Sequence, residues 1–142
     1  MKGKRKMKKT LVSLVAFLTI ITLALTSCSN TDPWGDAVYT EDTTLGTGET
    51  SFTLVVEVLA NSVTFTVNTD KTVLGEALLE LGVIDGEQGA YGLYVKVVNG
   101  ITADYDKDAS YWAFYKNGEA MMVGVDGEAI EEGASYSLVY TK

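Results

Sequence analysis

Few side chains in this sequence could perform chemistry, and the missing types are as informative as those present. The 142 residues contain no His and a single Cys. Without His there is no Ser-His-Asp or Cys-His catalysis and no imidazole ligand for a metal ion. Paired carboxylates could still serve glycoside hydrolysis. The acidic residues, however, fall in expected turns, polar stretches or a helix's polar face, and Glu57 stands alone on an expected strand. We therefore predict that the protein is not an enzyme.

A short acidic run is the candidate cation site. Asp104, Asp106 and Asp108 alternate within five residues, as at the start of an EF-hand calcium loop. Ala109 occupies the sixth position, where the loop needs Gly, and Tyr115 occupies the twelfth, where it needs Glu. A solvated acidic loop is therefore favoured, and weak calcium binding stays open as the alternative.

Residues 110–118 form the densest aromatic stretch of the chain. In a strand, Trp112 and Phe114 share one face, and Tyr111 and Tyr115 share the other. One face must belong to the core. The other would present two flat amphipathic rings, which are suited to contact with a ligand or partner. The alternative is that these tyrosines merely cover the surface of a sheet.

The first 27 residues have the pattern of a secretory signal. Six of the 11 basic residues lie within the first nine positions, and a mostly apolar run follows over residues 11–25. That run is short for a membrane span, which needs about 20 apolar residues. Residues 25–28, Leu-Thr-Ser-Cys, close it. They resemble the lipobox of bacterial lipoprotein precursors, in which the Cys becomes the lipidated first residue of the mature chain.

The resemblance to a lipobox implies a lipid on Cys28 and an extracytoplasmic protein held on the bacterial cell membrane. The mature chain would keep five basic and all 19 acidic residues, for a net charge of −14. A chain this acidic repels phosphate polymers, so nucleic acid is excluded as a partner. Membrane binding would rest on the lipid, because two or more acyl chains suffice for stable anchoring.

The remaining sequence predicts a tether followed by one folded domain. Residues 28–50 are polar and thin in large apolar groups, so we expect a lipidated Cys and a flexible tether; docking of Trp34 and Tyr39 on the domain is the open alternative. Residues 51–142 are long enough for one modest core. Alternating patterns predict strands over residues 52–59, 63–68, 93–98, 111–116, 119–123 and 135–141.

Helix and turn signals complete the predicted fold. Thr72 is expected to cap a helix that runs to Leu81 and stops at Gly82. We expect turns at residues 61–62 and at the two Asn-Gly pairs, 99–100 and 117–118. A hairpin, a single helix and then several strands indicate the α+β class, with a small β-grasp-like mixed sheet packed on one helix.

Five short segments of the domain resemble, in order, sequence motifs of the transcobalamin-like C-terminal domain family. They are the helix start over 72–78, Val-Asn-Gly-Ile over 98–101, the aromatic segment over 111–118, Gly-Val over 124–125 and the segment over 132–136. The resemblance covers about residues 52–140. It implies a β-grasp-like domain that binds a corrinoid, with no further cofactor required. The implied ligand contacts are Tyr111, Trp112, Phe114, Tyr115, Gly124 and Val125.

Two functions therefore stay open. The first is a cell-envelope lipoprotein whose non-catalytic domain binds a corrinoid, cobalamin-like ligand. The second is a surface module for an envelope protein or a glycan, with no small-molecule ligand. Such a module would use exposed strands and aromatic side chains.

Overall fold

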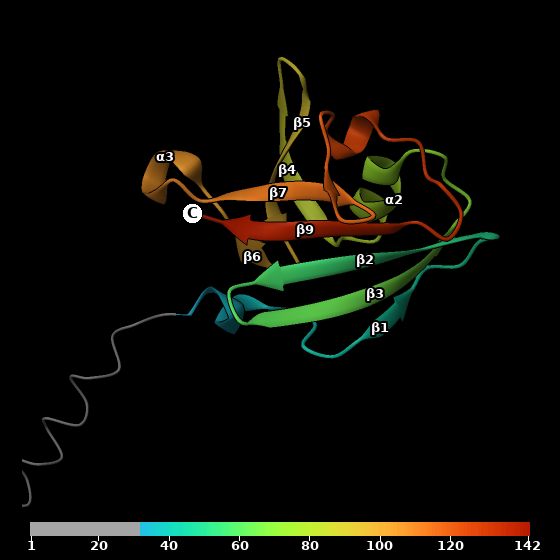
Figure 1. The fold of residues 1–142 in the computed structure, drawn as a ribbon, viewed down its shortest axis with the longest axis horizontal. Coiled ribbons are helices and arrows are strands. Elements are labelled where there is room, and N and C mark those ends of the chain that lie inside the picture. Colours follow the sequence, from blue (N-terminus) through green and yellow to red (C-terminus); the bar gives the residue numbers. More distant parts are fainter. Residues whose placement is uncertain (1–31) are drawn as a thin grey trace, which may run out of the picture. The chain divides into compact units, whose positions relative to one another are not determined.

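The computed structural model describes residues 32–142, and Figure 1 shows their fold. The predicted signal segment and Cys28 lie outside the described residues. Within this described part, no helix has the length and apolar character needed to cross a membrane. The predicted α+β class is confirmed: within residues 32–142, nine strands form two sheets, and α2 (Leu74–Glu80) is the main helix.

The larger sheet contains six strands in the order β1-β3-β2-β9-β7-β8. β2 pairs antiparallel with β3 and parallel with β9, and this parallel pair makes the sheet mixed, as predicted. β7 then pairs antiparallel with β9. The six strands are β1 (Thr43–Leu45), β2 (Thr50–Val58), β3 (Asn61–Thr69), β7 (Tyr111–Lys116), β8 (Glu119–Ala120) and β9 (Ser135–Thr141).

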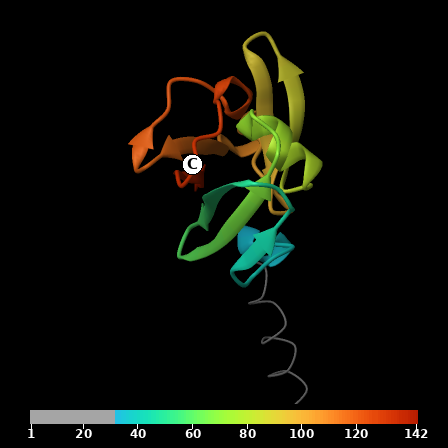
Figure 2. The same cartoon turned by 90° about the vertical axis from the view of Figure 1, so that its right-hand side faces the viewer.

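A second sheet, which the sequence did not predict, contains β4 (Ile84–Gly89), β5 (Gly92–Val98) and β6 (Ile101–Thr102). The six residues of β4 include two glycines and three polar side chains, so they have no strand pattern. Backbone pairing with β5 makes them a strand, across a bulge between Asp85 and Gly86. The β4–β5 hairpin projects away from the larger sheet (Figures 1 and 2).

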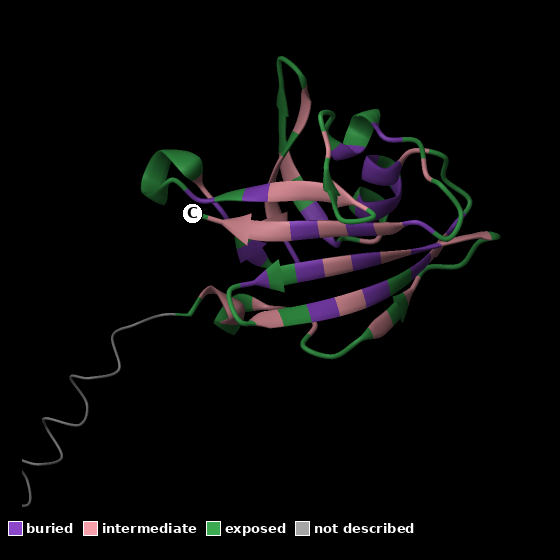
Figure 3. Ribbon diagram, in the orientation of Figure 1, coloured by how far each residue is buried: buried purple, intermediate pink, exposed green. Residues whose placement is uncertain are grey.

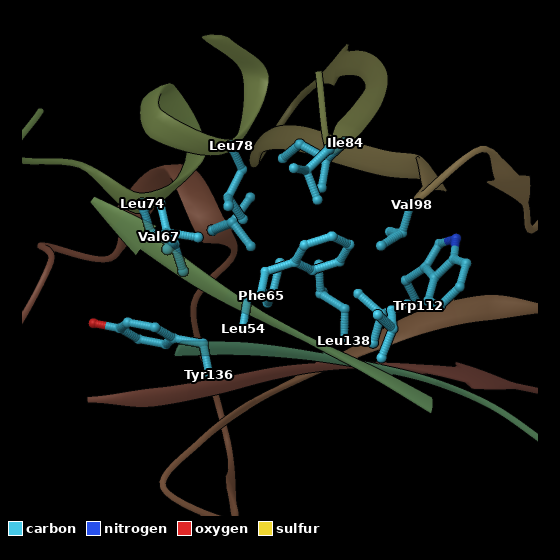
Figure 4. Packing of buried hydrophobic residues seen from close by; sticks show 14 of the residues in the cluster. Leu54, Phe65, Val67, Leu74, Leu78, Ile84, Val98, Trp112, Tyr136 and Leu138 are labelled. Carbon is cyan, nitrogen blue, oxygen red and sulfur yellow. The ribbon is translucent and has the colours of Figure 1, made fainter. Parts of the chain in front are cut away.

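The hydrophobic core lies between the larger sheet and a layer formed by α2 and the second sheet (Figure 4). Along β2 and β3, every second side chain points into the core. This alternation of buried and less buried residues appears as coloured bands on the two strands in Figure 3. Phe65, Leu54, Leu74, Leu78 and Tyr136 are among the fully buried side chains. Together these residues form one core, as the domain length predicts.

Helix α2 begins differently from the prediction. Its N-cap residue is Val73, with no side-chain cap, so the predicted cap at Thr72 is wrong. The backbone of this segment instead pairs with residues 128–130: the Leu74 N–H donates to the Glu128 carbonyl, and the Ile130 N–H donates to the Thr72 carbonyl. At the other end Gly82, with φ of +70°, stops the helix as predicted.

Two of the three predicted turns are confirmed. Asn99 and Asn117 adopt left-handed φ values of 51° and 50°, each followed by a Gly with positive φ. The turn predicted at residues 61–62 is wrong, because Val58 pairs with Asn61 and residues 59–60 make the turn. The strand predicted over 119–123 is shorter than expected, since β8 ends at Ala120.

Most of the predicted tether is part of the domain. The segment η1 (Pro33–Asp36) is a 3-10 helix, and β1 pairs parallel with β3. The Tyr39 ring lies edge-on to Phe65, with ring centroids 5.4 Å apart. The Asn99 side-chain amide also accepts from the Tyr39 N–H and donates to its carbonyl, both at 2.9 Å. The domain boundary therefore moves from residue 51 to Pro33, and residues 28–31 lie outside the described part.

Candidate ligand-binding site

A hollow of about 560 Å³ lies where the β4–β5 hairpin faces the segment that leads into β7. We call it the tyrosine hollow, because three tyrosine rings from different segments line it. The three tyrosines, Tyr94, Tyr105 and Tyr111, have exposed fractions of 42%, 60% and 41%. The lining residues are Glu87, Tyr94, Lys96, Asp104, Tyr105, Asp106 and Tyr111.

The hairpin wall of the hollow is held on the core by β5. Leu93 and Val95 pack against the core, so the alternation of the strand leaves Tyr94 and Lys96 on the other side. The Trp112 indole Nε1 donates to the Lys96 carbonyl at 3.0 Å. This hydrogen bond ties β5 to the beginning of β7, so it fixes the two walls of the hollow relative to each other.

The opposite wall is the short helix α3 (Tyr105–Asp108) and the start of β7. Asp104 caps the helix by accepting from the Asp106 N–H, and its own N–H donates to the Ser110 hydroxyl. Ser110 is fully buried and donates its hydroxyl to Asp108. That hydrogen bond, together with the one from the Ser110 N–H, lowers the pKa of Asp108. Ala109 then closes the helix in the left-handed conformation.

The ring and charge contacts divide the hollow into two halves. On the hairpin side the Lys96 ammonium lies 5.9 Å from the centre of the Tyr94 ring and 3.4 Å from Glu87. On the α3 side the rings of Tyr105 and Tyr111 meet edge to face, with centroids 6.4 Å apart. The hollow therefore offers ring faces and carboxylates to a guest, with a single ammonium group.

Only one of the predicted ligand contacts lines this hollow, namely Tyr111. Trp112 and Val125 are buried, at 8% and 2% exposed, and neither lines the hollow, so their ligand contacts stay a prediction. Phe114 stacks on the buried Tyr136 ring at 6.0 Å and packs against the core. As the strand period predicted, Trp112 and Phe114 share one face of β7; that face packs against the core, with Trp112 buried and Phe114 partly buried.

The other two predicted contacts lie elsewhere. Tyr115 shares the outer face of β7 with Tyr111, but it lines a separate hollow of about 260 Å³ beside Glu57 and Ser137. Gly124 is exposed at the start of η2 (Val125–Gly127), outside both hollows. Glu57 is exposed on the outer face of β2. Tyr111 and Tyr115 therefore do not form one site.

Sequence reasoning missed Tyr94 and Tyr105 as companions of Tyr111. A signal for Tyr94 was present, because alternation along residues 93–98 separates Tyr94 and Lys96 from the apolar Leu93 and Val95. For Tyr105 the only signal was its place inside the acidic run. That run faces the hairpin across the hollow only in the folded chain, so no local pattern could join Tyr105 to Tyr94.

The acidic run forms a helical turn rather than a calcium loop. Asp104 and Asp108 are used as local hydrogen-bond acceptors at the two ends of α3. Across residues 32–142 no group of three or more His, Cys, Asp or Glu side chains is arranged to hold a metal ion.

Comparison with known proteins places this domain in a family. Residues 70–141, about half of the chain, match DUF4430, a domain of unknown function. The chain belongs to the DUF4430 family. No curated protein sequence matches it.

Solved structures show the same fold. A candidate metal-binding protein from Ruminococcus gnavus ATCC 29149 is 30% identical, with a TM-score of 0.62; the match covers 66% of the DUF4430 chain and 98% of that protein. Haptocorrin in complex with cobinamide is 18% identical, with a TM-score of 0.51. That match covers 69% of this chain and 26% of haptocorrin, so this chain corresponds to about a quarter of that protein. The likeness to haptocorrin supports a fold related to the transcobalamin-like domains.

Proposed function

We propose that this DUF4430 protein is a non-catalytic ligand-binding lipoprotein of the bacterial cell envelope, and that its ligand binds in the tyrosine hollow. The observation that carries the proposal is the convergence of three exposed tyrosine rings on one hollow. Its volume lies within the range of about 300–1,000 Å³ that is usual for ligand sites. The hydrogen bond from Trp112 to the Lys96 carbonyl links the two walls, which favours binding because less conformational freedom is lost when the ligand arrives.

A corrinoid is the first ligand to test. The support is the fold shared with haptocorrin, whose structure holds cobinamide. A corrinoid combines a flat apolar frame with polar amide groups, and tyrosine rings with hydroxyl groups suit both. Because the hollow is open, it would contact one face of such a ligand. The metal binding named for the Ruminococcus gnavus protein is not part of the proposal, since the carboxylates of residues 32–142 form no metal cluster.

Titration of the full chain, purified in a non-ionic detergent, with cobalamin and cobinamide tests this proposal. We expect saturable one-to-one binding in calorimetry. Tyr111→Ala should weaken the binding about tenfold or more, because the ring offers both stacking and a hydroxyl group. Tyr115→Ala is the matched control, on the same strand and face but outside the hollow, and should bind like the wild type. Absence of heat up to millimolar ligand would refute the corrinoid.

The lipid anchor has its own test. Cys28→Ser should abolish metabolic labelling with palmitate and release the protein from the membrane. Ser29→Ala is the control, since it leaves the thiol in place. Continued labelling of Cys28→Ser would refute the anchor without bearing on the ligand site.

A surface interaction module is the second candidate function, and the smaller hollow favours it. There an aromatic ring, Tyr115, lies beside a carboxylate, Glu57, and a hydroxyl, Ser137, on the outer face of the larger sheet. Such groups suit a sugar or a polar peptide. This function predicts the reverse pattern, in which Tyr115→Ala removes binding to an envelope glycan or protein and Tyr111→Ala retains it.

A further inference from the structure

We infer that the tyrosine hollow selects ligands that carry a positive charge on an organic frame, of which an alkylated ammonium is the simplest example. The inference rests on the proposed function, because it names the ligand class of the same hollow.

The hairpin wall already places one ammonium group, that of Lys96, beside a tyrosine ring and a carboxylate. Lys96 places its Nζ atom 5.9 Å from the centre of the Tyr94 ring and 3.4 Å from the Glu87 carboxylate. A ring face attracts a cation through its quadrupole, and a nearby carboxylate adds a Coulomb attraction. The chain itself therefore demonstrates the pairing of ring and carboxylate that would bind a foreign ammonium group.

The opposite wall repeats these groups, and its one cation, Lys107 of α3, does not line the hollow. Tyr105 and Tyr111 supply the rings, and Asp104 and Asp106 supply the carboxylates. Within residues 32–142 neither of these two aspartates forms an ion pair. Three carboxylates and one ammonium line the hollow, so a positively charged guest meets a net negative charge there. An anionic guest would be repelled.

The rings decide between an organic cation and a bare metal ion. A metal ion such as calcium needs six to eight oxygen ligands around one point, and no such cluster is present among the described residues. Alkyl groups around a nitrogen spread the positive charge over an apolar surface, which packs on tyrosine faces at little desolvation cost. The hollow thus matches an alkylated ammonium in both charge and surface.

Lys96 provides a diagnostic substitution. Its ammonium competes with a cationic guest for the Tyr94 ring and repels that guest. Lys96→Met keeps the length of the side chain and removes the charge, and the Lys96 carbonyl still accepts from Trp112. We therefore expect Lys96→Met to tighten the binding of a cation, by roughly three- to tenfold given solvent screening at an open site. A site that recognises only shape would show no such gain.

The test compares choline with its uncharged isostere, 3,3-dimethylbutan-1-ol, on the full chain in a non-ionic detergent. Binding is followed by the NMR shifts of the tyrosine side chains. Choline should give saturable shifts of the three tyrosines at roughly millimolar concentration, and the isostere should bind about tenfold or more weakly. Asp106→Asn should weaken choline binding and Lys96→Met should tighten it, whereas Tyr115→Ala should leave it unchanged. Far-UV circular dichroism of each variant checks the fold.

The outcomes separate this inference from the proposed function. Equal binding of choline and the isostere, or no gain in Lys96→Met, would overturn the charge selection. If a corrinoid then still binds through Tyr111, the proposed function stands alone. If neither choline nor a corrinoid shifts the three tyrosines, both ideas fall.

Discussion

Asn99 is predicted to hold the N-terminal segment on the domain through two hydrogen bonds. It is 2% exposed, and its amide both accepts from and donates to the Tyr39 backbone at 2.9 Å. Asn99→Gly deletes both bonds while the left-handed φ of 51° stays accessible. At about 0.5–1.5 kcal/mol for each bond, the loss is about 1–3 kcal/mol. The added freedom of Gly in the unfolded chain and the relief of φ strain are each about 1 kcal/mol or less, and they oppose each other.

Asn117→Gly is the matched control for this substitution. Asn117 also precedes a Gly in a two-residue turn and has a φ of 50°. Its side chain makes one exposed hydrogen bond, accepted from the Ser135 N–H at 3.0 Å. The backbone change is the same in both variants, so the difference in unfolding free energy compares the two part-buried bonds of Asn99 with the single exposed bond of Asn117. We expect Asn117→Gly to cost about 0.5–1 kcal/mol.

The assay is urea unfolding of residues 32–142 followed by far-UV circular dichroism. The same measurement on a chain that starts at residue 41 completes a double-mutant cycle, because Tyr39 is then absent. In that shorter chain Asn99→Gly should change the unfolding free energy by less than about 0.5 kcal/mol. Equal costs for the two Asn→Gly variants, or an undiminished cost in the shorter chain, would refute the docking of this segment by Asn99.

Three further predictions concern the stability of the domain. Leu59 is 72% exposed and has a φ of +54°, a left-handed conformation that strains the backbone of a residue with a side chain. Leu59→Gly should therefore raise the urea midpoint, and a lower midpoint would contradict this strain. Gly75→Ala should destabilise despite better helix propensity, because the new Cβ would lie 3.1 Å from the Asp126 backbone, and a more stable variant in the same assay would contradict this. Burial raises the pKa of Tyr136, and the hydrogen bonds that the Lys116 ammonium donates to Glu128 and Glu131 raise the pKa of Lys116. The stability that these two groups contribute is therefore fully present below about pH 10, and it is lost as the pH rises through their raised pKa values. Tyr136→Phe should flatten this decline in urea midpoints measured from pH 8 to 11, and an unchanged slope would show that Tyr136 does not titrate in this way.

The strands and the helix face could be predicted because burial on one side leaves a regular pattern in the chain. Alternation along residues 52–58 and 63–67 identified the core positions of β2 and β3. Leu74, Ala77 and Leu78 have the spacing of one helix face, and all three are buried in α2. These patterns are local, because the period of a strand or helix is a property of its own backbone.

Elements defined by a distant partner could not be predicted in this way. β4 exists because β5 pairs with it, and its own residues have no strand pattern. The polar composition of residues 33–50 predicted a tether. The segment is instead docked by the pairing of β1 with β3 and by two hydrogen bonds between Tyr39 and Asn99, which are 60 residues apart. The long-range contact outweighed the local composition in both places.

The candidate site shows the same division. The sequence by itself determined that catalysis by His is absent, that the surface is acidic, and that Tyr111 lies on the opposite face of its strand from Trp112. Only the tertiary structure decided that Tyr111 shares a hollow with Tyr94 and Tyr105 rather than with Tyr115. Tyr111 and Tyr115 lie on one face of β7, four positions apart along a nearly straight strand. The residues that enclose a volume come from segments that only the packing of the core brings together.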